Sequence, residues 1–287
     1  MTKSPIRKTA VIASLLALLA SCEQPEPGEA IVRTQIGAGE KNGDTAQSGQ
    51  TSVESPCRSI IFEDSPFTHC VATPARHTIR TVLNGTNGVP LRSLAALSQA
   101  STIDERKVAF AMNGGMYQED GSPLGYYVQG GDRTSELNRA DGDGNFYMKP
   151  NGVFFGTDGK WEVRTTSDFL NNVQDRPQFG TQSGPMLVID GVLHPAIAAD
   201  GESKAIRNAV GVDLKGRAHF VISNAPVSFG KIARLYRDKL QVRDALYLDG
   251  NVSALWSPAA NRMDGGAPIG PILLVEKKAA APAEDPQ

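Results

Sequence analysis

The chain has 287 residues, with 29 Lys and Arg against 31 Asp and Glu, and 40% of its residues are hydrophobic. This near-neutral balance excludes the broad basic surface that nucleic-acid binding requires. The length fits one large domain or two small ones, and the apolar content is sufficient to build a hydrophobic core.

The first residues of the chain predict an export signal. Basic residues precede an apolar run, 11–19, which is too short to span a bilayer as a mature helix. The sequence Leu19-Ala20-Ser21-Cys22 then resembles the bacterial lipobox, in which the cysteine becomes the acylated first residue. We therefore expect a lipoprotein signal peptide over residues 1–21. An ordinary signal peptide that happens to contain a cysteine is the alternative.

The predicted lipid anchor at Cys22 would place the protein in the bacterial cell envelope. One acyl chain anchors weakly, so stable attachment takes more than one. Because Glu23 replaces the Asp that retains such proteins at the inner membrane, analogy favours the periplasmic face of the outer membrane.

Two segments have the composition of disordered chain. Residues 22–55 are rich in Gly, Glu, Gln, Thr and Ser and have few apolar residues, which predicts a solvated tether. Residues 277–287 predict a disordered tail. The folded domain is therefore expected over residues 56–276.

Two cysteines, Cys57 and Cys70, lie near the start of this domain. In the oxidising compartment that export implies, a disulfide is the default, and in the chain-entropy model a loop this short gains about 3 kcal/mol. Two free thiols, or a metal site shared with His69, are the alternatives. The domain has no further cysteine and no Cys-x-x-Cys pattern that would support a metal.

Apolar runs interrupted by turn residues predict antiparallel strands. Asp158-Gly159, Asp190-Gly191 and Lys215-Gly216 each separate two apolar stretches, which is a strong signal for a β-hairpin. Residues 78–83 and 108–112 add two further strand candidates. These units together favour a largely antiparallel sheet.

Helices are fewer in the predicted fold. One apolar stripe with helical spacing consists of Leu91, Leu94 and Ala95, and a second of Ile232, Leu235, Tyr236 and Leu240. The second helix leads directly into a predicted strand at residues 245–248. Because strands cluster instead of alternating with helices, we expect a single α+β domain with largely antiparallel or mixed sheets and a few packed helices.

Familiar cofactor and metal signatures are absent from the sequence. There is no HExxH, GxSxG or P-loop, and GGAPIG at Gly265 lacks the spacing of a dinucleotide site. The stretch DGDGNF imitates the opening of an EF-hand, but Phe146 and Gly152 stand where Gly and Glu are required. A polar turn is preferred there to a weaker Ca²⁺ site. We predict no cofactor and no metal.

Four segments share one pattern, an apolar run beside an abrupt cluster of polar and small residues. The clusters contain Asn113, Gly114, Gly115, Gln182, Ser183, Gly184, Arg207, Asn208, Asp249, Gly250, Asn251 and Ser253. Each cluster alone is typical of an ordinary turn. Together they offer a carboxylate, a guanidinium, amides, hydroxyls and flexible backbone, a set that suits an anionic, hydroxyl-rich ligand.

The motifs MNGGMY, QSGPMLVIDG, RNAVGVD and LYLDGNVS, in this order, resemble those of the phosphodiester glycosidase family. The bacterial members of this family are relatives of the animal enzyme that uncovers mannose 6-phosphate by removing N-acetylglucosamine. GNFYMKPNGVFF, residues 144–155, resembles the same bacterial branch, and the resemblance covers residues 76–275. The family tends to have Asp-Gly-Gly-x-Ser after the last strand, whereas here Asn251 follows Gly250.

The resemblance implies hydrolysis of a sugar-1-phosphodiester in envelope glycans or lipid-linked sugars. Phosphate is a good leaving group, and an oxocarbenium-like transition state needs a stabilising carboxylate or an activated water. Asp249 would be the nucleophile, base or electrostatic stabiliser, Arg207 would bind the phosphate, and Asn113 would complete the catalytic group. The other residues of the four clusters would bind substrate. Glu119, Asp120 and Asp213 lie near the motifs as candidates for a second carboxylate.

A non-catalytic glycan- or sugar-phosphate-binding lipoprotein is the alternative, favoured by the altered motif at Asn251 and by the unassigned second carboxylate. A structural envelope protein, in which the polar strand ends are turns, is a third. The expected partners are a phosphorylated sugar or glycan and, through Cys22, the membrane. We expect no nucleic acid and a monomer.

Overall fold

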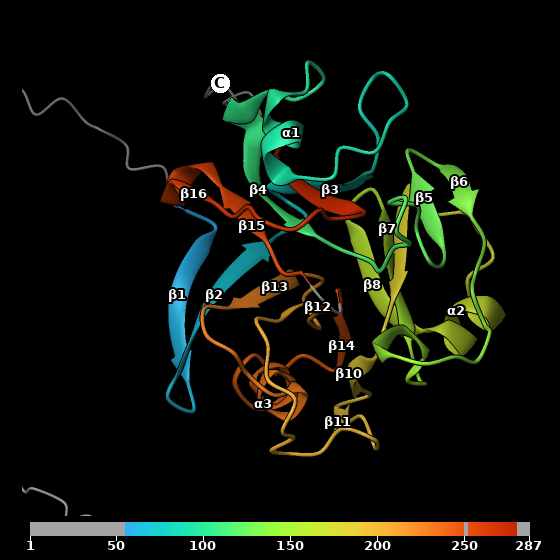
Figure 1. Ribbon diagram of the computed structural model, residues 1–287, viewed down its shortest axis with the longest axis vertical. Helices are drawn as coiled ribbons and strands as arrows, with labels where there is room; N and C mark the ends of the chain where they lie inside the picture. The colour runs from blue at the N-terminus through green and yellow to red at the C-terminus, as the bar shows by residue number, and fades with distance from the viewer. Residues whose placement is uncertain (1–54, 250–251, 280–287) are drawn as a thin grey trace, which may run out of the picture. The chain divides into compact units, whose positions relative to one another are not determined.

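The computed structural model describes residues 55–249 and 252–279, which form three β-sheets and a few short helices (Figure 1). The predicted signal peptide, Cys22, all of the tether except Ser55, Gly250, Asn251 and residues 280–287 of the tail lie outside these residues. Within the described ranges, no helix is long and apolar enough to cross a bilayer.

The largest sheet, sheet A, has the strand order β1-β2-β13-β12-β14-β10-β11. Its strands are β1 (Cys57–Phe62), β2 (Ser65–Ala72), β10 (Met186–Ile189), β11 (Val192–Leu193), β12 (Asn208–Val212), β13 (Ala218–Ser223) and β14 (Asp244–Tyr247). Strands β12, β13 and β14 form its centre, and β14 is the strand that leads to Asp249.

The two other sheets have five strands each. Sheet B has the order β16-β15-β4-β17-β3 and contains β3 (His77–Val82), β4 (Val108–Asn113), β15 (Leu255–Ser257), β16 (Arg262–Met263) and β17 (Ile272–Lys277). Sheet E has the order β6-β5-β9-β7-β8 and contains β5 (Tyr127–Gln129), β6 (Asp132–Ser135), β7 (Gly152–Thr157), β8 (Lys160–Thr165) and β9 (Phe179–Ser183). The pairings in all three sheets of the described chain are antiparallel.

The helical elements are short. They are α1 (Leu94–Gln99), η1 (Glu105–Lys107), η2 (Asn145–Tyr147), α2 (Thr166–Asn172), α3 (Phe229–Arg234), η3 (Leu235–Lys239) and η4 (Pro258–Ala260). The α+β expectation is therefore met only approximately, since antiparallel sheets dominate the described fold.

The three sheets share one central core, which their inner faces build. Alternation along β17 shows the division: Leu273 and Val275 point into this core, whereas Ile272 and Leu274 point to the opposite face. Aromatic side chains fill the centre with edge-to-face contacts, and the rings of Phe110 and Phe220 are 5.1 Å apart. Each such fully buried side chain stabilises the fold by roughly 2 kcal/mol.

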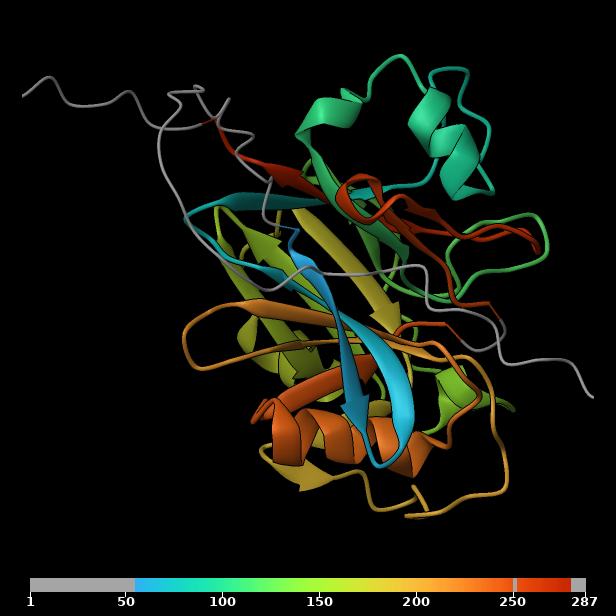
Figure 2. The same ribbon diagram turned by 90° about the vertical axis from the view of Figure 1, so that its left-hand side faces the viewer.

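Each sheet's outer face packs against a different helix, and Figure 2 shows α3, in orange, against sheet A. Helix α3 places Ile232 and Ala233 on sheet A, α1 places Leu94 and Leu97 on sheet B, and α2 places Phe169 on sheet E. Both faces of every sheet are therefore buried at their centres, which explains why the central strands have continuous apolar runs.

The predicted hairpins are confirmed. Asp158-Gly159 joins β7 to β8, and Asp190-Gly191 joins β10 to β11. All four of these residues have positive φ, with 47° at Asp158 and 80° at Gly159, as a tight two-residue turn requires. Lys215-Gly216 lies in the β12–β13 connection. The strands expected at 78–83 and 108–112 are β3 and β4.

The helix predictions hold with shifted boundaries. Helix α1 begins after Ser93, whose hydroxyl accepts a hydrogen bond from Ala96 N at 3.0 Å, so Leu91 of the apolar stripe precedes the helix. The second predicted helix is α3, which Ser228 caps in the same manner and which continues as the π-helical η3. It leads into β14 as expected.

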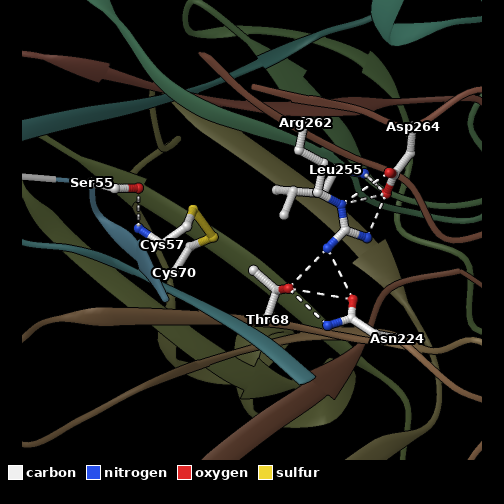
Figure 3. Close-up of a disulfide and its surroundings, with 8 residues drawn as sticks. All are labelled: Ser55, Cys57, Thr68, Cys70, Asn224, Leu255, Arg262 and Asp264. Carbon is white, nitrogen blue, oxygen red and sulfur yellow. Dashed lines mark hydrogen bonds and ion pairs between the residues drawn. A yellow bond between two sulfur atoms is a disulfide. The ribbon is translucent and has the colours of Figure 1, made fainter. Parts of the chain in front are cut away.

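The Cys57–Cys70 disulfide is present and joins directly paired residues of β1 and β2, which excludes the free-thiol and metal alternatives (Figure 3). Close by, the Arg262 guanidinium from β16 donates to Thr68 Oγ1 of β2 at 2.8 Å and to Asn224 Oδ1 at 2.9 Å. This cluster connects the edge of sheet B to sheet A.

Candidate active site

Three of the four polar clusters meet at the backbone of Leu248, just after β14. Its N–H donates to Asn208 O at 3.2 Å, and its carbonyl accepts from Gly115 N at 3.0 Å and from Ser183 Oγ at 2.8 Å. The segments that carry these residues come from sheets A, B and E, so the position of Leu248 is fixed by all three sheets. The next residue, Asp249, is thereby placed where the sheets converge.

Asn113 holds the carboxylate of Asp249. Its Nδ2 donates to Asp249 Oδ2 at 2.7 Å and to Val252 O at 2.7 Å. Its Oδ1 accepts from Asn208 Nδ2 at 2.9 Å and from Ala254 N at 2.8 Å. Asn113 is fully buried and Asp249 is 4% exposed, so the charge-assisted bond between them is shielded from water. The carboxylate is held in one orientation.

A second layer supports this pair. Asn208 Nδ2 also donates to the carbonyl oxygen of Asn113 at 2.8 Å. Ser253 Oγ donates to Ile206 O at 3.1 Å and lies 3.3 Å from Asn208 Oδ1. Asn208 and Ser253, predicted as substrate ligands, therefore make protein contacts behind Asp249, and their observed contribution is to position Asn113.

The two glycines of MNGGMY permit close packing between strands. A Cβ at Gly114 would lie 2.3 Å from Leu273 Cδ1, and one at Gly115 would lie 2.1 Å from Thr181 Oγ1. Gly115 also has a backbone φ of 107°, a conformation that residues other than Gly rarely adopt. The glycines thus bring β4 against β17 and β9, and this contact delivers Asn113 to Asp249.

A cleft of about 430 Å³ opens beside Asp249. It is lined by Met116, Tyr117, Gln118, Glu119, Leu124, Asp143, Gly144, Asn145, Phe146, Tyr147 and Asp249. Three of these side chains are carboxylates, and none of the described lining residues is Lys, Arg or His. The volume and the mixture of aromatic, amide and carboxylate groups suit a sugar ring.

The negative charge of Asp249 acts on two nearby phenols. Burial raises the pKa of Tyr117, and the charge of Asp249 raises it further, while Arg92 opposes the shift. Burial also raises the pKa of Tyr247 to about 12, a shift that Arg207 opposes and Asp249 increases. Both hydroxyls therefore stay protonated at neutral pH, and Tyr117 donates to Pro268 O at 2.5 Å.

The predicted phosphate ligand, Arg207, does not line this cleft. Its guanidinium is 1% exposed, donates to Val227 O at 2.8 Å and to Tyr247 Oη at 3.2 Å, and stacks 3.6 Å from the centre of the Phe229 ring. Because neighbouring residues of a strand point to opposite faces, Asn208 points toward Asn113 and Arg207 toward α3. A phosphate-binding role does not fit this arrangement.

Two further predicted ligands also have other partners. Gln182 is 1% exposed, and its Oε1 accepts from Tyr126 N at 3.0 Å while its Nε2 donates to Thr166 Oγ1 at 3.1 Å. Gly184 packs so closely that a Cβ would lie 2.7 Å from Phe146 O. Both residues contribute to the walls behind the cleft, with no contact to its interior.

The structure distinguishes the candidates for a second carboxylate. Glu119 lines the cleft, and so does Asp143, for which the sequence predicts only a polar turn. Asp120 bonds locally to Ser122, and Asp213 lies at the opposite end of β12 from Asn208. In residues 55–249 and 252–279, no group of three or more His, Cys, Asp or Glu side chains is arranged to hold a metal ion.

Sequence reasoning missed most of the cleft wall. Tyr117 is part of MNGGMY, and Asn145, Phe146 and Tyr147 of η2 are part of the segment 144–155, but the sequence alone assigns no role to these residues. The usable signal was the dense polar and aromatic stretch around η2, which contains more aromatic residues than an ordinary turn needs.

Comparisons with known proteins identify the family of this chain. The phosphodiester glycosidase family model matches residues 106–276, which include Asn113, Asp249 and the cleft. The Escherichia coli (strain K12) protein YigE, described as uncharacterized, is 35% identical over 211 residues, which are 71% of this chain and 80% of YigE.

The fold also resembles a solved structure, the catalytic domain of zebrafish N-acetylglucosamine-1-phosphodiester alpha-N-acetylglucosaminidase auto-inhibited by its pro-peptide. The TM-score is 0.53 at 14% identity, over 77% of this chain and 82% of that chain. This likeness concerns the fold. The family match over most of the described domain, with the buried Asn113–Asp249 pair inside it, shows that this chain belongs to the phosphodiester glycosidase family.

Proposed function

We propose that this protein is a hydrolase that cleaves a sugar-1-phosphodiester on the glycosidic side, with Asp249 as the catalytic carboxylate. The observation that carries the proposal is the buried Asp249, held by Asn113 at 2.7 Å and lining a cleft of about 430 Å³. The membership in a family of hydrolases supports the reaction class.

The chemistry follows from the position of one charged group. As the bond between the sugar and the phosphate lengthens, positive charge develops at the anomeric carbon. Asp249 lies in a poorly hydrated site, where a carboxylate stabilises such charge more strongly than in water. Asn113 keeps the carboxylate oriented throughout, so little reorganisation is needed when the bond breaks. Asp249 can act as the nucleophile or activate a water molecule.

A second carboxylate contributes less to the proposed reaction. Glu119 and Asp143 both line the cleft and can donate a proton or direct water. Because a phosphate monoester is a stable leaving group, its departure needs little protonation. We therefore expect neither residue to be as important as Asp249.

The proposed substrate belongs to the bacterial envelope. The predicted signal peptide and the lipobox at Cys22 support a lipid-anchored protein on the periplasmic face of the outer membrane. Glycans and lipid-linked sugars that contain phosphodiesters are the substrates within reach of such an anchor. Globomycin sensitivity and mass spectrometry of the mature N-terminus would test the anchor; an unmodified N-terminus would contradict it.

The activity test compares the full chain with its Asp249→Asn variant on a chromogenic N-acetylglucosamine-1-phosphodiester. We expect kcat to fall about a thousandfold or more, because the developing positive charge loses its counter-charge. Circular dichroism should show an unchanged fold, since the amide nearly matches the carboxylate in shape.

Asp120→Asn is the matched control, because this exposed carboxylate follows Glu119 in the β4–β5 connection, does not line the cleft, and bonds only to Ser122 in the described structure. It should keep full activity. Unchanged turnover by Asp249→Asn would reject the assignment. If calorimetry shows saturable binding of the phosphodiester by the unmodified chain and no product forms, the binding-protein alternative replaces the enzyme.

A further inference from the structure

A second cavity, of about 560 Å³, lies beside α2 and contains none of the predicted site residues. We call it the α2 cavity. It is lined by Arg139, Lys149, Pro150, Asn151, Thr165, Thr166, Ser167, Leu170 and Asn171. None of the described residues that line it is Asp or Glu. Its charge is therefore opposite to that of the cleft beside Asp249.

The two positively charged side chains of the α2 cavity, Lys149 and Arg139, differ in how far their charge is compensated by partners. Lys149 Nζ donates to Asp141 Oδ1 at 2.5 Å and to Arg139 O at 2.9 Å, so its charge is largely compensated. The Arg139 guanidinium makes no hydrogen bond or ion pair with any residue of the described chain. Arg139 is therefore an available donor for an anion, with the planar geometry that matches phosphate.

The α2 cavity and the cleft are neighbours along the chain. Tyr147 lines the cleft and Lys149 lines the α2 cavity, so their Cα atoms are at most about 7 Å apart. Asn151 Nδ2 donates to Phe146 O at 2.9 Å, which fixes the segment that separates the two spaces. One extended ligand can therefore reach both.

The opposite charges of the cleft and the α2 cavity determine which part of a substrate each of them binds. Three carboxylates line the cleft, and a second phosphorylated unit placed among them, in addition to the scissile phosphate, would meet like charge at short range. The α2 cavity offers an uncompensated guanidinium, the Ser167 hydroxyl and the Asn171 amide. Leu170, 49% exposed, provides an apolar surface of the kind on which sugar rings pack.

We propose that the α2 cavity binds an anionic sugar unit on the leaving-group side of the scissile phosphodiester, with Arg139 as its principal ligand. The inference rests on the proposed function and deepens it. It assigns the protein a substrate of at least two units, a saccharide in the Asp249 cleft joined through phosphate to a second, negatively charged saccharide.

The test measures the steady-state kinetics of the full chain with two substrates. One is the methyl phosphodiester of N-acetylglucosamine 1-phosphate, and the other carries a second sugar with its own phosphate in place of the methyl group. Arg139→Gln should raise KM about tenfold for the two-unit substrate, the usual effect of losing one charge-assisted contact, and by less than about twofold for the methyl ester. The value of kcat should stay unchanged for both.

Arg133→Gln is the matched control, because Arg133 is an arginine of β6 that pairs with Glu136 at 2.9 Å and lines neither space. Arg133→Gln should leave KM unchanged for both the two-unit substrate and the methyl ester. Equal effects of Arg139→Gln on both substrates, or no effect on either, would overturn the inference.

Calorimetry with the Asp249→Asn chain separates this inference from the proposed function. The two-unit ligand should bind about tenfold more tightly than the methyl ester, and Arg139→Gln should remove the difference. The unmodified chain and its variants could turn over neither substrate while the Arg139-dependent binding remains. In that case the enzyme assignment fails and the α2 cavity assignment stands. Equal affinity for the two ligands would refute the α2 cavity assignment whatever the turnover.

Discussion

Asn113 Nδ2 lies 2.7 Å from Asp249 Oδ2, although the two residues are 136 positions apart in the chain. They come from different sheets, since Asn113 ends β4 of sheet B and Asp249 follows β14 of sheet A. The contact exists because the inner faces of the sheets share one core. A change in how the sheets pack would therefore act on the carboxylate directly.

Replacement of Asn113 by Leu should lower kcat by roughly ten- to a hundredfold, because Asp249 loses a hydrogen bond to its charged form. The acid limb of the pH–kcat profile should also move to higher pH, which a purely structural defect would not cause. Steady-state kinetics over a pH series measures both effects. Asn172→Leu, an exposed position on α2, is the control, and an unshifted profile in Asn113→Leu would argue against a positioning role.

Replacement of Arg207 by Met should destabilise the protein by about 2–4 kcal/mol, because the buried hydrogen bonds of the guanidinium to Val227 O and Tyr247 Oη are lost and the Phe229 ring loses its cation. Urea denaturation measures the loss. KM for a sugar phosphodiester should stay nearly constant in the folded fraction. A large rise in KM with little change in stability would restore the phosphate-binding role that the sequence predicted.

Acid should destabilise the fold through a buried histidine pair. His69 Nε2 and His219 Nδ1 are 3.0 Å apart, and His219 Nε2 contacts Asp213 at 3.1 Å. Burial, with the nearby His219, Arg58 and Arg217 charges, lowers the pKa of His69 to about 3, and burial also lowers the pKa of His219. His69 is therefore neutral in the folded state at pH 5, and His219 takes up a proton only at a lower pH than an unburied histidine does.

The sign of this effect follows from proton binding. Below about pH 6.5 the unfolded chain protonates His69 and the folded chain does not, so the free energy of unfolding falls as pH falls from 6.5 toward 3, and the lowered pKa of His219 acts in the same direction. Over this range His69 contributes a slope of about 1.4 kcal/mol per pH unit. Denaturant titrations between pH 7 and 4 should show that His69→Gln reduces the slope by about one proton, and equal slopes would contradict this account.

Removal of the Cys57–Cys70 disulfide should lower the free energy of unfolding by about 3 kcal/mol, since the cross-link restricts the unfolded chain. The Cys57→Ser/Cys70→Ser double variant measures this in guanidinium titrations, and reduction of the unmodified chain should reproduce the shift. Activity at low temperature should be retained, because the disulfide joins β1 to β2 at the edge of sheet A. A loss of activity without a loss of stability would show that the disulfide shapes the site.

Local patterns determined much of the fold from the sequence. The Asp-Gly pairs at 158–159 and 190–191 encode tight hairpins because their residues tolerate positive φ, and the apolar stripe from Ile232 encodes α3 through its helical spacing. The pairing of Cys57 with Cys70 followed from their number and the expected compartment. Each of these features depends on residues that are close together in the chain.

Tertiary packing decided the site. The sequence grouped Arg207, Asn208 and Asp249 as one ligand set, but strand alternation sends Arg207 to the α3 face and Asn208 to the core. Whether a polar residue at a strand end lines the cleft or supports it depends on the register between sheets, which no short-range pattern specifies. For the same reason Asp143 and Arg139, in one polar segment, could be assigned to two separate spaces only after the sheets were in place.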